Sequence, residues 1–381
     1  MKKCCILFLI SFLIVSNSFG KNKKQIRRNK NQFYFKIDGT INADTGKVFL
    51  RFYSDYTLNK TEELVARVKN NKFSISGYIS EPQGVYVSFE KHYTSSNFII
   101  EKGVQTISIN TDSTRKMPAI VNNTMINEYP LYSAFFKQLN SKRSIFDQKY
   151  DSVYKLNHYQ LPKAIKLNHD KEDDNLYAES NQLLLRYTEK NPSSKIAFWT
   201  LIQKMIFGYE PIFDSIYNAF SGELKNGYAG NVLNKKIENG KILSVGALFP
   251  ALQCVNRKNE KFSSAMFFKR KLTLIDFWYS GCGPCRAQFN RLKELYNQFS
   301  NKGFEIVGIS VDSETDKKKW EDIIINEKLI WQQYWDMNGK YSQRLSIYAL
   351  PTNFLIDSTG KIIAKNISLE ALDELLSKSS K

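Results

Sequence analysis

Two cysteines separated by two residues constrain this chain more than any other feature. The segment Gly-Cys-Gly-Pro-Cys, residues 281–285, follows an apolar run typical of a buried strand, residues 272–278, and opens a stretch with helical periodicity. A thiolate, not a thiol, is the nucleophile in disulfide exchange, and the first turn of a helix favours an anion. We therefore predict that Cys282 is exposed, with a pKa below the ordinary thiol value of about 8.5, and that Cys285 lies beneath it. Such a pair can cycle between a dithiol and a small-ring disulfide, which predicts redox chemistry.

The use of cysteine elsewhere in the chain supports a chemical role for this pair. Of the five cysteines, Cys4 and Cys5 lie in the N-terminal segment and Cys254 stands apart. Exported proteins that use cysteine for stability usually have several well-separated pairs. A disulfide that spans two intervening residues closes a very small loop, so it contributes little to the stability of the fold. We predict that Cys254 lies in a short strand as a buried, reduced thiol.

Asp276 and Pro351 are the other candidate catalytic residues. Asp276 lies within the apolar run before the cysteines, which predicts a buried carboxyl group that relays the proton of Cys285 through water; a solvent-exposed aspartate at a strand edge is the alternative. Pro351 precedes a predicted strand, where an X-Pro bond is either cis or an ordinary trans turn. The residues that we expect to contact a substrate are Trp278, Gly283, Pro284 and Leu350.

The first two parts of the chain differ in their hydrophobic periodicity. Residues 31–115 alternate apolar and polar positions between turn-forming pairs, which predicts a small all-β domain, a sandwich or a barrel, without a catalytic site. Residues 120–240 carry apolar residues at helical spacing, which predicts a helical connector.

The last part, residues 241–381, alternates strand and helix patterns. The predicted strands cover residues 272–278, 304–311 and 353–356. The predicted helices cover residues 289–299 and 315–327, and a last helix begins after Ser368 as its N-cap. This alternation predicts an α/β domain with a central sheet, so we expect a multidomain protein.

The N-terminus has the pattern of an export signal. Two lysines precede an apolar run from Cys4 to Val15, and small residues lead to a cleavage site after Gly20. A membrane anchor is the less favoured alternative, since a spanning helix needs about 20 apolar residues. We expect a signal peptide over residues 1–20, a basic arm over residues 21–30, and a location in the periplasm or cell envelope.

Charge and histidine content argue against two kinds of partner. The net charge of +18 suits nucleic acid or an anionic membrane, but the charge is spread along the chain and we find no nucleic-acid-binding module. We therefore expect no nucleic-acid partner. His92, His158 and His169 lie far in sequence from the cysteine pair, so we expect no metal site and no cofactor.

Two segments carry a resemblance to a known family. Residues 276–286 resemble the active-site segment of thioredoxins, and residues 350–357, followed by Gly-Lys, resemble their cis-proline strand. Residues 241–381 as a whole resemble the exported TlpA/ResA family of thioredoxin-like thiol–disulfide oxidoreductases, and the front part resembles the extension of Bacteroidetes-type members. The resemblance implies a thioredoxin fold in which Cys282 attacks, Cys285 resolves and a cis Pro351 guards the site. It also matches Asp276 to the buried acid.

Three positions depart from the family pattern. Gly281 stands where a tryptophan is usual, which opens the surface beside Cys282. Gln288 stands where many members carry glutamate, so a proton relay would rest on Asp276 alone. Asn290 replaces a common helix-kinking proline, so we expect a straighter helix.

The resemblance implies an enzyme that reduces disulfides of other exported proteins and receives its electrons from a membrane thiol carrier. Gly-Pro between the cysteines resembles strongly reducing thioredoxins, whose potential is about −270 mV, so reduction is favoured over oxidation. Two alternatives stay open. One is a thiol peroxidase of the same fold; the other is a binding or targeting protein whose redox pair only senses state.

Overall fold

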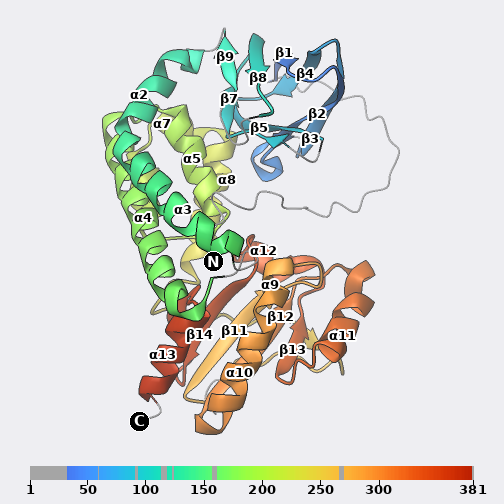
Figure 1. The fold of residues 1–381 in the computed structure, drawn as a ribbon, viewed down its shortest axis with the longest axis vertical. Helices are drawn as coiled ribbons and strands as arrows, with labels where there is room; N and C mark the ends of the chain where they lie inside the picture. Colours follow the sequence, from blue (N-terminus) through green and yellow to red (C-terminus); the bar gives the residue numbers. More distant parts are fainter. Residues whose placement is uncertain are drawn as a thin grey trace.

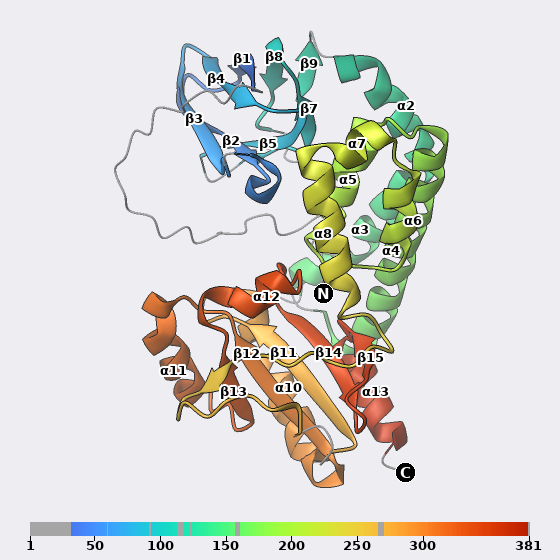
Figure 2. The same ribbon diagram turned by 180° about the vertical axis from the view of Figure 1, so that it is seen from behind.

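The protein consists of three packed parts. The computed structural model describes residues 32–58, 60–90, 93–112, 118–121, 124–156, 161–265 and 270–379. A β-rich part and an α/β part lie at opposite ends of the molecule, and a group of long helices joins them along one side (Figures 1 and 2). The predicted signal peptide and basic arm lie outside the described residues.

The β-rich part is one curled sheet. Within the described residues, nine strands form a single sheet in the order β6-β5-β2-β3-β4-β1-β8-β9, with β7 paired to β5. One apolar cluster contains residues from β1 and β8 as well as from β2 and β5, so the sheet closes around a common core as a sandwich or barrel would. The strands are β1 (Phe33–Ile41), β2 (Thr45–Phe52), β3 (Glu63–Lys69), β4 (Lys72–Ile79), β5 (Gln83–Phe89), β6 (Tyr93–Thr94), β7 (Phe98–Ile100), β8 (Gly103–Ile109) and β9 (Ala119–Val121), and a short helix η1 (Ser54–Tyr56) follows β2.

The middle part is helical, as the periodicity predicts. Ser194 caps α5 by accepting a hydrogen bond from the Ala197 N–H, and α5 buries one apolar side chain after another. Trp199 of α5 reaches the β-rich part, where its indole N–H donates to the Pro82 carbonyl. Every helix in the described portion of the chain is too short or too polar to span a bilayer. The helices are η2 (Thr124–Asn127), α2 (Glu128–Phe135), α3 (Lys137–Leu156), α4 (Lys163–Lys190), α5 (Lys195–Met205), α6 (Ile212–Ala219), α7 (Gly222–Asn226) and α8 (Tyr228–Lys241).

The last part has a thioredoxin-like α/β fold. Its sheet, in the residues described, has the order β10-β13-β12-β11-β14-β15, with β11, β12 and β13 parallel and β14 antiparallel to β11. The strands are β10 (Val255–Asn256), β11 (Leu272–Trp278), β12 (Phe304–Ser310), β13 (Gln332–Trp335), β14 (Thr352–Asp357) and β15 (Ile362–Lys365). The helices are α9 (Gly283–Ala287), α10 (Phe289–Phe299), η4 (Ser300–Lys302), η5 (Glu314–Asp316), α11 (Lys317–Asn326), η6 (Met337–Gly339), α12 (Lys340–Arg344) and α13 (Leu369–Ser379).

Each face of this sheet has its own core. One apolar cluster joins β11 to α10, α11 and α13, and it contains both cysteines of the pair. The other joins the opposite face of β11 to the segment 243–262, and it contains Cys254. Cys254 is a buried free thiol, as predicted, although the neighbouring strand β10 begins one residue after it. The alternation of side chains along β11 therefore decides which residues lie beside the redox pair.

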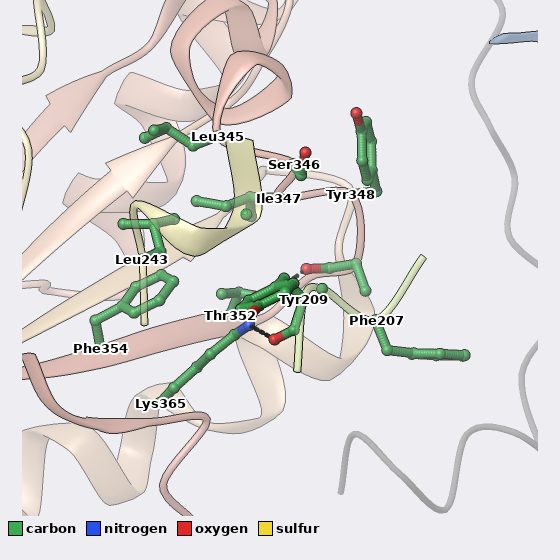
Figure 3. A pocket seen from close by; sticks show the side chains of 13 residues that line it. Phe207, Tyr209, Leu243, Leu345, Ser346, Ile347, Tyr348, Thr352, Phe354 and Lys365 are labelled. Carbon is green, nitrogen blue, oxygen red and sulfur yellow. Dashed lines mark hydrogen bonds between the residues drawn. The ribbon is translucent and has the colours of Figure 1, made fainter. Parts of the chain in front are cut away.

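Polar contacts fasten the helical part to the α/β part. The Lys365 ammonium group donates to the Tyr209 carbonyl at 2.7 Å (Figure 3), the Ser346 hydroxyl donates to the Lys236 carbonyl at 3.1 Å, and Lys166 bonds Glu370. The small cavity at this junction has a volume of about 10 Å³, enough for a single water molecule at most. The arrowhead of β11 points toward α12 and the helical part (Figure 2), so the end of the sheet that carries the cysteines faces the rest of the molecule.

Candidate redox site

Cys282 and Cys285 form a disulfide at the first turn of α9. Their Cα atoms lie 5.3 Å apart. Cys282 is the N-cap of the helix, and its Sγ accepts a hydrogen bond from the Cys285 N–H at 3.1 Å. Pro284 stands in the first turn, where a backbone N–H would have no partner in the helix anyway. The local sequence therefore brings the two sulfurs together through a single turn of helix.

The prediction that Cys282 is exposed is wrong for this disulfide form. Only 3% of Cys282 and 1% of Cys285 are accessible, because both side chains pack in the cluster that contains Trp278 and Phe289. Access remains at one edge, since Gly283 is exposed and a Cβ added to it would meet nothing within 4 Å in the described structure. A reaction partner can therefore approach Cys282 over Gly283.

The structure shows what two of the departures from the family pattern do near the disulfide. Gly281 is exposed, and a Cβ there would come within 2.9 Å of the Tyr279 ring, so a larger side chain would require Tyr279 to move. The helix is not straightened by Asn290, contrary to our expectation. It is interrupted at Gln288, where α9 ends and α10 begins.

Asp276 is buried, with 4% of its surface accessible, so the alternative of an exposed strand-edge aspartate is wrong. Side chains on a strand alternate between faces, so Asp276 shares its face of β11 with Leu274 and Trp278. Both neighbours belong to the apolar cluster that holds Cys282 and Cys285. Asp276 therefore lies on the face of the sheet beneath the disulfide.

Asp276 belongs to a row of polar residues that sequence reasoning missed. Strand register places Asn353 of β14, Asp276 of β11, Gly308 of β12 and Gln333 of β13 side by side. Register partners share a face, so the row crosses the sheet beneath the cysteines. The signals in the sequence were Asn353 in β14 and Gln333 in β13, polar residues at positions that share a face of the sheet with Asp276.

Gly308 makes this polar row possible. A Cβ at Gly308 would lie 2.2 Å from the Gln333 Oε1, so the glutamine side chain occupies the space above the glycine. That oxygen accepts a hydrogen bond from the Trp278 indole N–H at 3.1 Å. Trp278 is only 1% exposed and packs edge-on against Phe289. In this state Trp278 supports the disulfide from below and has no surface to offer a substrate, contrary to the prediction.

The loop before Cys282 is held by Asp312, which sequence reasoning also missed. The Asp312 carboxylate accepts hydrogen bonds from the Ser280 backbone N–H at 2.9 and 3.0 Å, the Ser280 hydroxyl at 2.6 Å and the Ser310 hydroxyl at 2.6 Å. Burial raises the pKa of Asp312 above its ordinary value, although the two serine residues oppose the shift. The register of β11 and β12 brings these residues together, which explains why no local sequence signal announced them.

Replacing Asp312 with alanine is expected to lower the free energy of unfolding by about 1–3 kcal/mol, because buried donors on Ser280 and Ser310 lose their acceptor. Urea unfolding at neutral pH measures the change. Asp322→Ala is the control, since Asp322 pairs with the exposed Lys318 four residues earlier and such pairs contribute about 0.3–0.5 kcal/mol. Equal effects of the two variants would contradict the role of Asp312.

The raised pKa of Asp312 also gives this prediction a pH dependence. The folded protein holds the Asp312 proton more tightly than the unfolded chain, whose carboxyl pKa is near the ordinary 3.8. The stability that this group contributes is therefore full below that value and declines as the pH rises through the folded pKa. As the pH rises from 3.8 through the folded pKa of Asp312, the free energy of unfolding of the wild type should fall relative to that of Asp312→Asn. A difference that does not change with pH would contradict the shift.

The Leu350–Pro351 peptide bond is cis, as the resemblance implies. The Thr352 hydroxyl donates to the Ala349 carbonyl at 2.6 Å and braces the loop around this bond. Thr352 opens β14 opposite Phe277 near the end of β11, so the cis-proline loop and the cysteine loop emerge at the same edge of the sheet. Leu350 is half-buried and Pro284 is half-buried, which leaves part of each at the surface. Among the described residues, no group of three or more His, Cys, Asp or Glu side chains could hold a metal ion.

Comparison with known proteins agrees with this geometry. Residues 245–365 match the AhpC/TSA family, and residues 35–129 match a family described as a domain of unknown function, DUF4369. The thiol–disulfide oxidoreductase ResA of Bacillus thuringiensis is 32% identical over 114 residues, which are 29% of this chain and 65%, just under two thirds, of that relative. ResA of Oceanobacillus iheyensis is 30% identical over 135 residues, 34% of this chain and 68% of that relative.

Solved structures from Bacteroides are also similar to this chain. The C-terminal domain of a thiol-disulfide oxidoreductase described as putative, from Bacteroides thetaiotaomicron, is 33% identical, with 36% of this chain and 97% of that chain covered and a TM-score of 0.33. A thiol-disulfide oxidoreductase from Bacteroides fragilis is 37% identical, with 34% and 98% covered and a TM-score of 0.32. Through its α/β part, the chain belongs to the thioredoxin-like AhpC/TSA family, among the relatives of the ResA thiol–disulfide oxidoreductases.

Proposed function

We propose that this protein is an exported thiol–disulfide oxidoreductase that reduces disulfides of other cell-envelope proteins through Cys282 and Cys285. The observation that carries the proposal is the disulfide at the start of α9, reachable over the exposed Gly283 and flanked by the cis Pro351 loop. The relatives named ResA are thiol–disulfide oxidoreductases, which supports the same chemistry here. The export signal predicted over residues 1–20 supports a location in the periplasm or envelope.

The reaction runs in two exchange steps. The Cys282 thiolate attacks one sulfur of a substrate disulfide, forms a mixed disulfide and releases the other substrate sulfur as a thiolate. Cys285 then loses its proton to Asp276 through water, attacks the Cys282 Sγ and releases the second substrate thiolate. The substrate gains two electrons, and the protein is left with the disulfide seen in the structure. A membrane thiol carrier would return two electrons and restore the dithiol.

The remaining site residues have supporting roles in this scheme. Gly283 leaves room for the substrate chain, and Pro284 and Leu350 offer it their half-buried surfaces. Pro351 lies at the same sheet edge as the disulfide and limits access to it. Trp278 packs below the cysteines and takes no part in binding while the disulfide is formed.

Two substrates separate the proposal from the peroxidase alternative. The pre-reduced protein is mixed with insulin in one assay and with hydrogen peroxide in another, and the loss of protein thiols is followed in each. We expect rapid loss with insulin, accompanied by the appearance of insulin thiols, and only slow loss with peroxide. Rapid peroxide consumption without insulin reduction would assign the protein to the thiol peroxidases. Mass spectrometry of the secreted chain checks export, since a mature N-terminus at Lys21 is expected.

A further inference from the structure

Two buried amide groups flank Asp276 in the polar row beneath the cysteines. The register places Asn353 beside Asp276 on β14, and it places Gln333 on the other side, across Gly308. Only 6% of Gln333 and 5% of Asn353 are accessible. In the part of the chain that the structure describes, the Gln333 Nε2 and the Asn353 Oδ1 have no hydrogen-bond partner. A buried polar atom without a partner costs free energy, so these two atoms call for an explanation.

Gln333 brings a hydrogen-bond donor to the side of Asp276. Its side chain reaches across to β11, where its Oε1 accepts the Trp278 indole N–H at 3.1 Å. Because an indole nitrogen can only donate, this bond fixes which end of the amide is the oxygen. The Nε2 atom lies 2.8 Å from the place that a Cβ of Gly308 would occupy, and Gly308 is the register partner of Asp276. The free N–H groups of Gln333 therefore lie over the strand next to Asp276.

Asn353 brings an acceptor to the other side. Its Nδ2 donates to the Ile367 carbonyl at 3.1 Å, which fixes the orientation of this amide as well. Ile367 follows β15, and β15 lies on the opposite side of β14 from β11. The amide nitrogen is thus used on the β15 side, and the oxygen is left for Asp276. Cross-strand neighbours have Cβ atoms about 4.5–5.5 Å apart, so the two side chains can meet directly or through one water.

A donor on one side and an acceptor on the other suit the two protonation states of a carboxyl group. A carboxylate only accepts hydrogen bonds, whereas a carboxylic acid also donates one through its O–H. The Gln333 N–H therefore stabilises the carboxylate form of Asp276, and the Asn353 oxygen stabilises the acid form. The two amides act on the proton affinity of Asp276 in opposite directions.

We propose that Gln333 and Asn353 are positioning residues that enable Asp276 to take the proton of Cys285 and to release it again. When the Cys285 S–H bond breaks, the proton becomes the O–H of Asp276, which donates to the Asn353 oxygen. When the substrate thiolate leaves, it takes up this proton, and the carboxylate again accepts from the Gln333 N–H. The inference rests on the proposed function and extends its second step from Asp276 to two amides on neighbouring strands.

The charged groups of the elements packed on this face are engaged with other partners. The helices that cover the face are α9, α10, α11 and α13, and Cys285 is the titratable group of α9 that lies in the cluster. On β12, Glu305 lies three residue pairs along the ladder from Asp276. The surrounding contacts are Arg270 with Glu305, Arg286 with Glu327, Arg291 with Asp373, Asp312 with Ser280 and Ser310, and Lys317 over the Trp335 ring. The two amides are neutral, so they act on Asp276 through hydrogen bonds and not through charge.

The test measures the second exchange step as a function of pH in two variants of the full-length protein. Gln333→Met and Asn353→Leu each remove one amide at nearly constant volume. The mixed disulfide formed with hydroxyethyl disulfide is followed by rapid acid quenching and mass spectrometry. A hydrogen bond made in only one protonation state changes a proton affinity about tenfold. We therefore expect the midpoint of the rate profile to rise by about one pH unit in Gln333→Met and to fall by about one pH unit in Asn353→Leu.

The chain offers a matched control for each variant. Gln83 of β5 and Asn181 of α4 are also buried amides with one oxygen that lacks a partner in the described structure, but they lie in the β-rich and helical parts. Gln83→Met and Asn181→Leu should therefore leave the midpoint as in the wild type. If the amides only support packing, their loss would admit water in both variants and move both midpoints in the same direction. Shifts of the same sign, or no shifts, would overturn the proposal.

Infrared spectroscopy adds a measurement that does not require the amide variants to fold. At a pH where Asp276 is protonated, the difference between the wild type and Asp276→Asn should contain the C=O stretch of a hydrogen-bonded buried acid. A band at the position of an unbonded acid would contradict the proposal.

Hydroxyethyl disulfide also separates failure of this proposal from failure of the proposed function. If the pre-reduced wild type does not react with it, the proposed function itself fails. If the wild type forms and resolves the mixed disulfide but the two variants show no opposite shifts, the role of the amides is overturned and the redox function stands.

Discussion

Replacing Cys282 with alanine is expected to abolish reduction of insulin by the pre-reduced protein. The mechanism has a single attacking sulfur. Among the described residues, the thiol left beside it is Cys285, which is 1% exposed in the apolar cluster beneath. Replacing Cys285 with alanine should instead leave the attack intact and remove the second step. Mixed disulfides with the substrate should then accumulate, detectable as a larger species in non-reducing gel electrophoresis and lost on addition of a reductant.

Cys254→Ala is the matched control for both cysteine variants. Cys254 is fully buried on the opposite face of the sheet, and burial raises the pKa of its thiol far above the ordinary value, so it stays protonated and unreactive. This variant should reduce insulin as the wild type does. Activity retained by Cys282→Ala, or lost in Cys254→Ala, would overturn the assignment of the nucleophile.

Local sequence predicted those parts of the site whose geometry is local. The disulfide joins residues within one helical turn, so the spacing of Cys282 and Cys285 was sufficient. The burial of Asp276 followed from its apolar neighbours in β11. Asp312 and Gln333 were missed because their partners lie far away in the sequence. Ser280 follows β11 and Asp312 follows β12, while Trp278 lies on β11 and Gln333 on β13, so each pair meets only through the assembly of the sheet.

The exposure of Cys282 could not be predicted from spacing alone. A helix N-cap is usually near the surface, but the side chain of Cys282 points toward the core, where it packs in the cluster that contains Trp278 and Phe289. Strand prediction failed in a similar way for β13 and β15, whose four residues each are too few for a periodic pattern to stand out. The helix break at Gln288 shows that the proline replaced by Asn290 is not needed for a kink.

The contacts between the three parts of the protein could not be predicted from the sequence, for a different reason. Its contacts join residues far apart in the chain, such as Lys365 with Tyr209 and Lys236 with Asp55. Periodicity can predict that a helix has an apolar face, but it does not say which distant surface that face meets. A pocket of about 600 Å³ that is lined by residues of all three parts therefore has no signature in any single segment.

Replacing Asp276 with asparagine is expected to slow disulfide reduction at pH 7 by about a hundredfold, near the lower end of what a positioned acid or base contributes. The buried Cys285 thiol must lose a proton before it can resolve the mixed disulfide, and Asp276 is the titratable member of the polar row beneath it. Asparagine has the same shape but accepts no proton. The mixed disulfide with hydroxyethyl disulfide should therefore last longer, which rapid acid quenching and mass spectrometry measure.

The pH profile shows whether Asp276 acts as a base or only supports the fold. In Asp276→Asn the proton of Cys285 must leave to solvent, so the rate should recover as the pH approaches the ordinary thiol pKa of about 8.5. Glu305→Gln is the control. Glu305 is a buried carboxyl group on the neighbouring strand β12 and pairs with Arg270. It lies three residue pairs along the β11–β12 ladder from Asp276. It should leave the rate and its pH profile unchanged. If the deficit of Asp276→Asn is the same at every pH, Asp276 serves packing alone, and the proton of Cys285 leaves by another route.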